Sequence, residues 1–208
     1  MTLTRVLWLA ALLALCITPA RAEPLEDLKR FYAEVNSLSA RFEQRLIDED
    51  GDTLERYEGR FWLRRPGQFL WRYEAPFPQE IGTDGRQLWH YDVDLRQVTL
   101  RPAQGSLGGT PAELLGGDAA QLDNYVFERL ADAEGLEWLK LVPRSDDTDF
   151  ESVNIGLRDG VPVRIDLQDR LGQLTRMQLI DLKRNPALDP DIFDFRIPDG
   201  VTVVDERG

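Results

Sequence analysis

Aromatic residues concentrate in one short stretch of this chain. The thirty-one positions from Phe61 to Tyr91 contain eight of its nineteen Phe, Trp and Tyr residues. Alternation with a period of two is typical of β-strands, whose successive side chains point to opposite faces. The stretch therefore predicts a pleated sheet with a broad apolar face. Two series of alternate positions carry the pattern: Phe69, Trp71 and Tyr73, then Trp89, Tyr91 and Val93.

Turn dipeptides separate these strands from further alternating segments. Apolar residues alternate with mostly polar ones from Val153 to Leu157 and again from Val161 to Leu167. The pattern predicts an antiparallel meander with one face in the core and the other in water. The dipeptides suited to reversing the chain are Asp50-Gly51, Pro66-Gly67, Asp84-Gly85, Asp159-Gly160 and Asp199-Gly200.

Two segments predict helices. Apolar residues at helical spacing from Leu25 to Val35 predict one amphipathic helix that ends near Asn36. The segment from Thr110 to Leu115 lies between glycines and predicts a capped helical turn, which is either a movable element or an ordinary crossover between two halves of the sheet. The expected capping residues are Thr110 as N-cap, Pro111 as first residue, Glu113 in a capping box and Gly116 at the end.

Residues 1–22 predict a secretory signal peptide cleaved after Ala22. Arg5 precedes an uncharged run of about a dozen residues, shorter than the ~20 that span a bilayer, and Ala20-Arg21-Ala22 supplies a small-x-small site. We therefore expect residues 23–208 to be exported as a single domain. The alternative is a lipoprotein with its lipid on Cys16, which Leu15 disfavours because the residue before such a cysteine is normally small.

Charge and composition exclude several classes of function. Loss of the signal peptide removes two arginines and no acid, so the net charge changes from −12 to −14, which disfavours nucleic acid and anionic membranes as partners. His90 is the only histidine and Cys16 the only cysteine, so catalytic triads and His- or Cys-rich metal sites are excluded. Nucleotide-binding motifs are absent from the sequence, and no carboxylate pair stands out. We expect a protein that is not an enzyme and has no cofactor or metal.

Arg65 is the charged residue most open to a functional interpretation. Pro66 restricts it to an extended backbone, and Phe69 and Trp71 follow on the next strand. If its side chain points inward, carbonyl groups of a covering helix are its natural hydrogen-bond acceptors. The other interpretation, which the sequence favours, is a surface arginine beside Arg64.

The chain resembles the LolA family of periplasmic outer-membrane lipoprotein carriers over essentially its whole length after the signal peptide. Each motif is weak alone, but the five occur in the family's order and spacing. They are Phe42-Glu43-Gln44, the run from Gly59 to Trp71, Asp84-Gly85 with Leu88 to Asp92, the turn from Thr110 to Leu115, and the ending from Phe193 to Val201.

The resemblance implies a fold that is mainly β with a few helices: an unclosed antiparallel β-barrel of about eleven strands with an α-helical lid. It implies a monomeric periplasmic carrier that receives acylated lipoproteins from an inner-membrane ABC transporter and delivers them to an outer-membrane acceptor. The alternative is a lipid-anchored acceptor of the same fold, which would require lipidation of Cys16. An envelope-stress regulator of this fold would need a further domain.

The resemblance also suggests which residues form the site. Arg65 would hold the lid closed, and Phe69 would lie where cargo engages. The residues expected to bind acyl chains are Phe61, Leu63, Phe69, Trp71, Tyr73, Trp89 and Tyr91. The residues expected in the lid are Leu28, Phe31, Tyr32, Pro111, Leu114 and Leu115.

Overall fold

A computed structural model describes residues 23–103, 111–116, 119–146, 148 and 150–207. One twelve-stranded sheet dominates it, in the spatial order β12-β6-β5-β4-β3-β2-β1-β11-β10-β9-β8-β7. The predicted signal peptide lies outside the described residues. The strands are β1 (Ser37–Ile47), β2 (Thr53–Arg64), β3 (Gln68–Ala75), β4 (Gln79–Thr83), β5 (Gln87–Asp92), β6 (Gln97–Pro102), β7 (Tyr125–Arg129), β8 (Glu137–Pro143), β9 (Phe150–Arg158), β10 (Val161–Asp169), β11 (Leu174–Arg184) and β12 (Thr202–Asp205).

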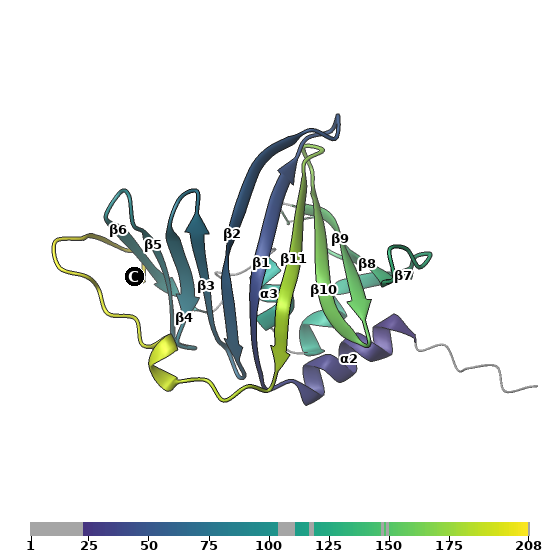
Figure 1. Ribbon diagram of the computed structural model, residues 1–208, viewed down its shortest axis with the longest axis horizontal. Coiled ribbons are helices and arrows are strands. Elements are labelled where there is room, and N and C mark those ends of the chain that lie inside the picture. Colours follow the sequence, from purple (N-terminus) through teal and green to yellow (C-terminus); the bar gives the residue numbers. More distant parts are fainter. Residues whose placement is uncertain (1–22, 104–110, 117–118, 147, 149, 208) are drawn as a thin grey trace, which may run out of the picture.

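The predicted fold is confirmed, with one added strand. Strands β1 to β11 pair antiparallel with their neighbours, whereas β12 pairs parallel with β6. The sheet curves strongly, and its two ends, β12 and β7, are not neighbours in the strand order. Figure 1 shows the long β1–β2 and β10–β11 hairpins rising at the end of the sheet opposite α2.

Glycine sets the tight turns between strands. Gly67, Gly85 and Gly160 have φ angles of 68°, 92° and 73°, which side chains with a Cβ rarely adopt. Each lies where the sequence predicts a reversal between antiparallel strands. Gly200, at φ 69°, instead precedes β12, so the last of the predicted turns leads into a parallel strand.

Helix α2 (Pro24–Glu34) confirms the predicted N-terminal helix. Pro24 stands in its first turn together with two acidic residues, which suits the exposed N–H groups there, and Val35 ends it in an extended conformation. Leu28 and Phe31 on its apolar face are buried. Burial of each side chain stabilises the fold by roughly 1.5–3 kcal/mol. The second predicted helix is α3 (Pro111–Gly116), although its expected N-cap Thr110 and the Glu113 side chain lie outside what is described.

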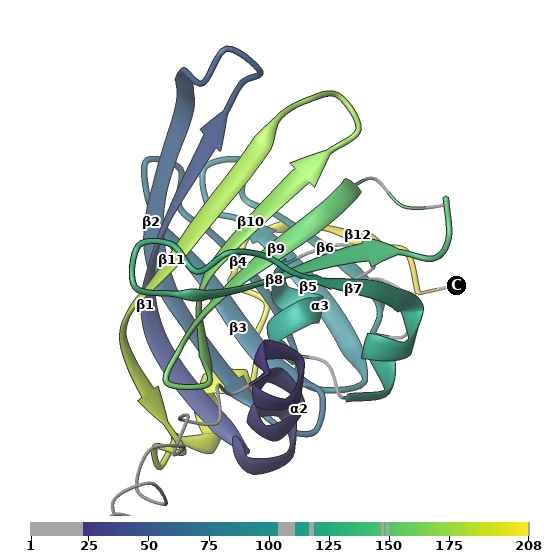
Figure 2. The same cartoon turned by 90° about the vertical axis from the view of Figure 1, so that its right-hand side faces the viewer.

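Two apolar clusters form on opposite faces of the sheet. The larger lies on the concave face and includes buried apolar side chains of α2 and α3. Figure 2 shows both helices within the curve of the sheet. The smaller contains Leu70, Trp89, Val98 and Leu100 on the outer face. It is covered by the C-terminal segment, which includes the short 3-10 helix η2 (Pro190–Phe193). A second 3-10 helix, η1 (Ala119–Asn124), precedes β7.

Candidate functional site

Aromatic rings from three adjacent strands line the concave face. Trp71 of β3 lies 4.6 Å from Phe61 of β2 and 5.0 Å from Phe42 of β1, measured between ring centroids. Tyr73 continues the series at 5.0 Å from Phe42. The rings meet because alternate residues share a face and the strand register places Phe61 directly opposite Trp71. They form an apolar wall suited to hydrocarbon.

The structure places five of the seven residues expected to bind acyl chains on this wall. Phe61, Leu63, Phe69 and Trp71 are buried in the concave cluster, and Tyr73 packs against it. The hydroxyl of Tyr73 donates to Oε1 of Gln44 at 3.1 Å. Burial raises the pKa of that hydroxyl, so the wall carries no charge from Tyr73.

The grouping of Trp89 and Tyr91 with these five is corrected by the structure. Both side chains belong to the outer-face cluster, where the ring of Phe195 lies 5.0 Å from Trp89 and 6.2 Å from Tyr91. The prediction failed because the alternate positions of β5 are also partly apolar, and Leu88 is the residue that faces the concave cluster. The alternating pattern predicts that the sheet has two faces but does not show which of them is concave.

Helices α2 and α3 cover the wall, and five of the six expected lid residues have described side chains. Leu28, Phe31, Tyr32, Leu114 and Leu115 are all buried in the concave cluster. Pro111 is the first residue of α3. Because these side chains occupy the concave face in this conformation, acyl chains could bind there only if the helices move.

Arg65 joins both helices to the sheet. Its Nε donates to the carbonyl of Val35 at 2.9 Å, at the end of α2. Its Nη2 and Nη1 donate to the carbonyls of Leu115 at 2.9 Å and Gly116 at 3.1 Å, at the end of α3. The last carbonyls of a helix lack intrahelical donors, and neither helix has a basic residue in its last turn. One guanidinium therefore supplies the missing cation to two helix ends.

Aromatic contacts fix the guanidinium in this position. Its carbon lies 4.9 Å from the ring centroid of Tyr32 and 5.8 Å from that of Phe31, both on α2. The hydroxyl of Tyr32 also donates to the carbonyl of Leu114, which links the two helices directly. The inward interpretation of Arg65 is therefore the correct one, and the surface interpretation is wrong.

The neighbouring Arg64 has a different environment. Its Nε donates to Oε1 of Gln68 at 2.7 Å, and its guanidinium lies 4.7 Å from the ring centroid of Phe193. These contacts tie it to the outer face and the C-terminal segment. Arg64 is thus a natural control for Arg65.

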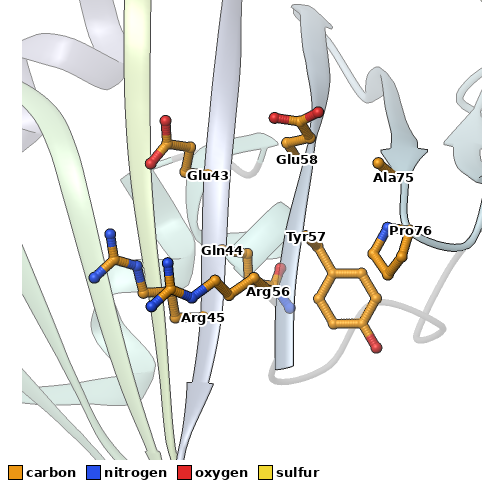
Figure 3. Close-up of a pocket in the computed structure, with 8 residues that line it drawn as sticks. All are labelled: Glu43, Gln44, Arg45, Arg56, Tyr57, Glu58, Ala75 and Pro76. Carbon is orange, nitrogen blue, oxygen red and sulfur yellow. The ribbon is translucent and has the colours of Figure 1, made fainter. Parts of the chain in front are cut away.

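Two hollows open on the surface near the sheet. The hollow in Figure 3, of about 320 Å³, is bounded by Ala75 and Pro76 and by residues of β1 and β2. Four of its side chains, Glu43, Arg45, Arg56 and Glu58, alternate with concave-face residues and are exposed, so the hollow is a charged surface feature. The other, of about 450 Å³, lies beside the β10–β11 turn and is lined in part by Phe150 and Leu167 of the concave cluster.

His90 is the only histidine in the sequence. His90 lies on β5 with its Nε2 2.8 Å from Oε1 of Gln79, and burial lowers the pKa of the imidazole. Within the described ranges, no group of three or more His, Cys, Asp or Glu side chains is placed to hold a metal ion. No helix in the described part of the chain has the length and apolar character needed to cross a membrane.

A family model described as "Outer membrane lipoprotein carrier protein LolA" matches residues 33–196, which is well over half of the chain. The chain belongs to the LolA family. The match spans most of the sheet and includes Arg65 and α3. It begins within α2 and ends in the C-terminal segment that covers the outer face.

Similar LolA-family proteins match at nearly full length. An outer-membrane lipoprotein carrier protein of Alkalilimnicola ehrlichii is 44% identical over 206 residues, covering 96% of this chain and 95% of the relative. One of Halorhodospira halophila is 40% identical and covers 94% and 92%. One of Methylococcus capsulatus is also 40% identical and covers 90% of both chains.

Solved structures support the fold alone. A crystal structure of an uncharacterized conserved protein from Thermus thermophilus has a TM-score of 0.56 at 17% identity, covering 88% of this chain and 97% of the other. A crystal structure of MucB has a TM-score of 0.52 at 18% identity, covering 87% of this chain and 64% of the other. The LolA-type half-open sheet is therefore shared by distant sequences.

Sequence reasoning missed two residues of the wall. Phe42 is 1% exposed and contacts both Trp71 and Tyr73, although the sequence alone marked it only as part of a family motif. Gln44 accepts the hydrogen bond of Tyr73. Leu38, Ala40 and Phe42 occupy alternate positions, so the same period-two pattern could have identified this strand.

Proposed function

We propose that this protein is a periplasmic carrier that holds the acyl chains of lipoproteins on its concave face, beneath α2 and α3. The observation that carries the proposal is the apolar wall covered by two short helices whose ends converge on Arg65. Membership of the LolA family and the names of its relatives support the same function. No catalytic step is needed for it.

The energetics explain why such a carrier needs an apolar cavity. Moving one methylene group out of water is favourable by roughly 0.8 kcal/mol. Exposing three chains of about fifteen methylenes to water would therefore cost on the order of 35 kcal/mol. The concave wall offsets most of this cost when the helices open over the cargo. In this proposal an inner-membrane ABC transporter supplies the lipoprotein and an outer-membrane acceptor takes it, with the carrier acting as a monomer.

Arg65 is the proposed latch of the lid. The hydrogen bonds to Val35, Leu115 and Gly116 end at backbone carbonyls, so they break when the helices leave and re-form when the helices return. Charge-assisted hydrogen bonds of this kind are individually worth about 1.5–3 kcal/mol, small beside the gain from burying acyl chains. Cargo binding can therefore open the latch.

Replacing Arg65 by Leu tests the proposal. The protein without its signal peptide is incubated with inner membranes that contain labelled lipoproteins and ATP, and soluble lipoprotein is measured after the membranes are removed. We expect release with the wild type and a several-fold reduction with Arg65→Leu, because the helices are no longer held over the chains. Arg64→Leu is the matched control and should release as the wild type does.

Two results would contradict different parts of this proposal. Absence of soluble lipoprotein with the wild-type protein would overturn the carrier function itself. Equal release by Arg65→Leu and the wild type would leave the carrier function in place but remove Arg65 from the latch. Circular dichroism of each variant excludes loss of the sheet as the cause.

A further inference from the structure

Two buried indole N–H groups lack an acceptor. Trp71, 3% exposed, and Trp89, 1% exposed, have no hydrogen-bond partner for Nε1 among the residues that the structure describes. Trp89 lies on the outer face beneath Phe195. Trp71 lies on the concave wall, where the proposed cargo binds. Only Trp71 can therefore meet an acceptor that arrives with cargo.

The surroundings of Trp71 explain why its donor is unpaired. Its indole is flanked by the rings of Phe42 and Phe61, which offer no strong acceptor. The hydroxyl of Tyr73 donates to Gln44, and no hydrogen bond joins its oxygen to the indole N–H of Trp71. A buried N–H without a partner loses its hydrogen bonds to water and gains none in return, so such groups are rare and each needs an explanation. An alkyl chain cannot satisfy it.

An acyl chain differs from a plain hydrocarbon by its carbonyl group. The oxygen of an ester or amide carbonyl is a good acceptor for an indole N–H. We propose that the indole N–H of Trp71 donates to the carbonyl oxygen of a cargo acyl group, so that the site distinguishes acyl chains from alkyl chains. This inference rests on the proposed function, since it assigns a contact within the same site.

The contact would also favour the loaded state over the empty one. In the closed, empty conformation the donor of Trp71 is buried without a hydrogen-bond partner among the described residues, which raises the free energy of that state. A carbonyl that enters with cargo removes this penalty. Burial of the hydrocarbon supplies most of the affinity, and the hydrogen bond from Trp71 makes the site prefer acyl chains to alkyl chains.

Paired lipid probes test the inference without any mutation. One probe is a diacylglyceryl lipopeptide with two ester-linked chains, and the other is the same lipopeptide with ether-linked chains that have equal numbers of carbons but no chain carbonyls. We expect the wild-type protein to bind the ester probe about fivefold more tightly, the order expected for one net hydrogen bond. Affinities are measured by displacement of a fluorescent fatty-acyl probe.

Matched variants then assign the selectivity to one indole. Trp71→Phe keeps an aromatic ring but loses the N–H, so its ester-to-ether ratio should fall to about one. Trp89→Phe removes the other unpaired N–H and should keep the wild-type ratio. In ¹⁵N-labelled wild-type protein, the indole N–H signal that Trp71→Phe abolishes should shift downfield with the ester probe and not with the ether probe.

The outcomes separate this inference from the function it rests on. If the wild type binds both probes tightly and equally, or if Trp71→Phe keeps the wild-type ratio, the role of Trp71 is overturned while the carrier function stands. If neither probe binds, both the role of Trp71 and the carrier function are overturned. An ester preference that disappears only in Trp71→Phe, with the matching shift of the indole signal, supports the inference.

Discussion

Gly59 lies where three elements of the concave wall meet closely. It stands opposite Phe42 on β1, and a Cβ at this position would lie 2.9 Å from the Phe42 ring and 2.0 Å from the carbonyl oxygen of Arg72 on β3. A backbone oxygen cannot move aside as a flexible side chain can. The absence of a side chain at Gly59 therefore lets the wall pack tightly at its centre.

Substitution of Gly59 by Ala should destabilise the protein by about 3 kcal/mol, because the new methyl group overlaps backbone atoms. The free energy of unfolding from urea titration measures the effect. Gly116→Ala is the matched control: its Cβ would lie 3.6 Å from Phe69 and 3.8 Å from Leu63, which is ordinary contact, so a change within about 1 kcal/mol is expected. Equal stability of the two variants would show that the strands separate easily at Gly59.

His90 gives the stability a dependence on pH. Burial is the main cause that lowers its pKa in the folded protein, and Arg101 also lowers it while Asp92 opposes the shift. The unfolded chain therefore binds a proton at a higher pH than the folded one. The contribution of His90 is fully present above about pH 6.5 and is lost as the pH falls from there through the folded pKa.

Replacing His90 by Gln should flatten the dependence of unfolding free energy on pH just below 6.5. Glutamine can still donate to Oε1 of Gln79 but does not titrate. Since His90 is the only histidine, no other imidazole contributes in this range. Urea titrations at several pH values measure the slope, and an unchanged slope in His90→Gln would contradict the assignment.

At the scale of elements, α2 and α3 depend on each other more than on their own sequences. A six-residue helix is too short to be stable alone, because nucleation costs more than one turn of hydrogen bonds returns. The carbonyl of Leu114 in α3 accepts from Tyr32 of α2, and Arg65 binds the ends of both helices. We expect the two helices to leave the sheet together.

Removal of the Tyr32 hydroxyl should loosen α3 selectively. In Tyr32→Phe, we expect backbone amides of α3 to exchange with solvent about tenfold faster, while the global unfolding free energy falls by about 1 kcal/mol or less. Hydrogen exchange measured by mass spectrometry resolves the segment. Tyr73→Phe is the control, since its hydroxyl donates to Gln44 on β1; equal exchange in both variants would contradict the coupling.

The elements that sequence predicts well are those whose signals are local. Alternation located the strands, and Pro66-Gly67 and Asp84-Gly85 marked true reversals because glycine there adopts a positive φ angle. The helix from Pro24 followed from its apolar spacing. Parallel pairing of β12 with β6 and the covering of Trp89 by Phe195 depend on contacts more than a hundred residues apart, for which no local pattern exists. The sequence favoured the wrong direction for the Arg65 side chain, because its hydrogen-bond partners lie 30 to 51 residues away along the chain.

At the scale of the whole molecule, the C-terminal segment protects the outer face. The ring of Phe195 stacks on Trp89 with an interplanar angle of 10°, and Ile192 and Val201 pack on the same cluster. β12 then pairs with β6 at the end of the sheet. The segment thus covers both an apolar patch and a strand edge that would otherwise favour self-association.

Truncation of Phe195 to Ala should expose this patch. We expect a loss of about 1–2 kcal/mol in unfolding free energy and the appearance of dimers in size-exclusion chromatography at high concentration. Phe77→Ala is the control, because Phe77 is already 60% exposed and its loss should change neither quantity measurably. If Phe195→Ala behaves like Phe77→Ala, the segment does not protect the outer face.

The sheet ends at β12 on one side and β7 on the other, and these two strands are not paired with each other. Its walls can therefore move apart by bending, with every ladder of inter-strand hydrogen bonds intact. A closed β-barrel would have to break the hydrogen bonds between two neighbouring strands to widen by the same amount. If the proposed function holds, acyl chains of different bulk can be accommodated by a change in the curvature of the sheet alone.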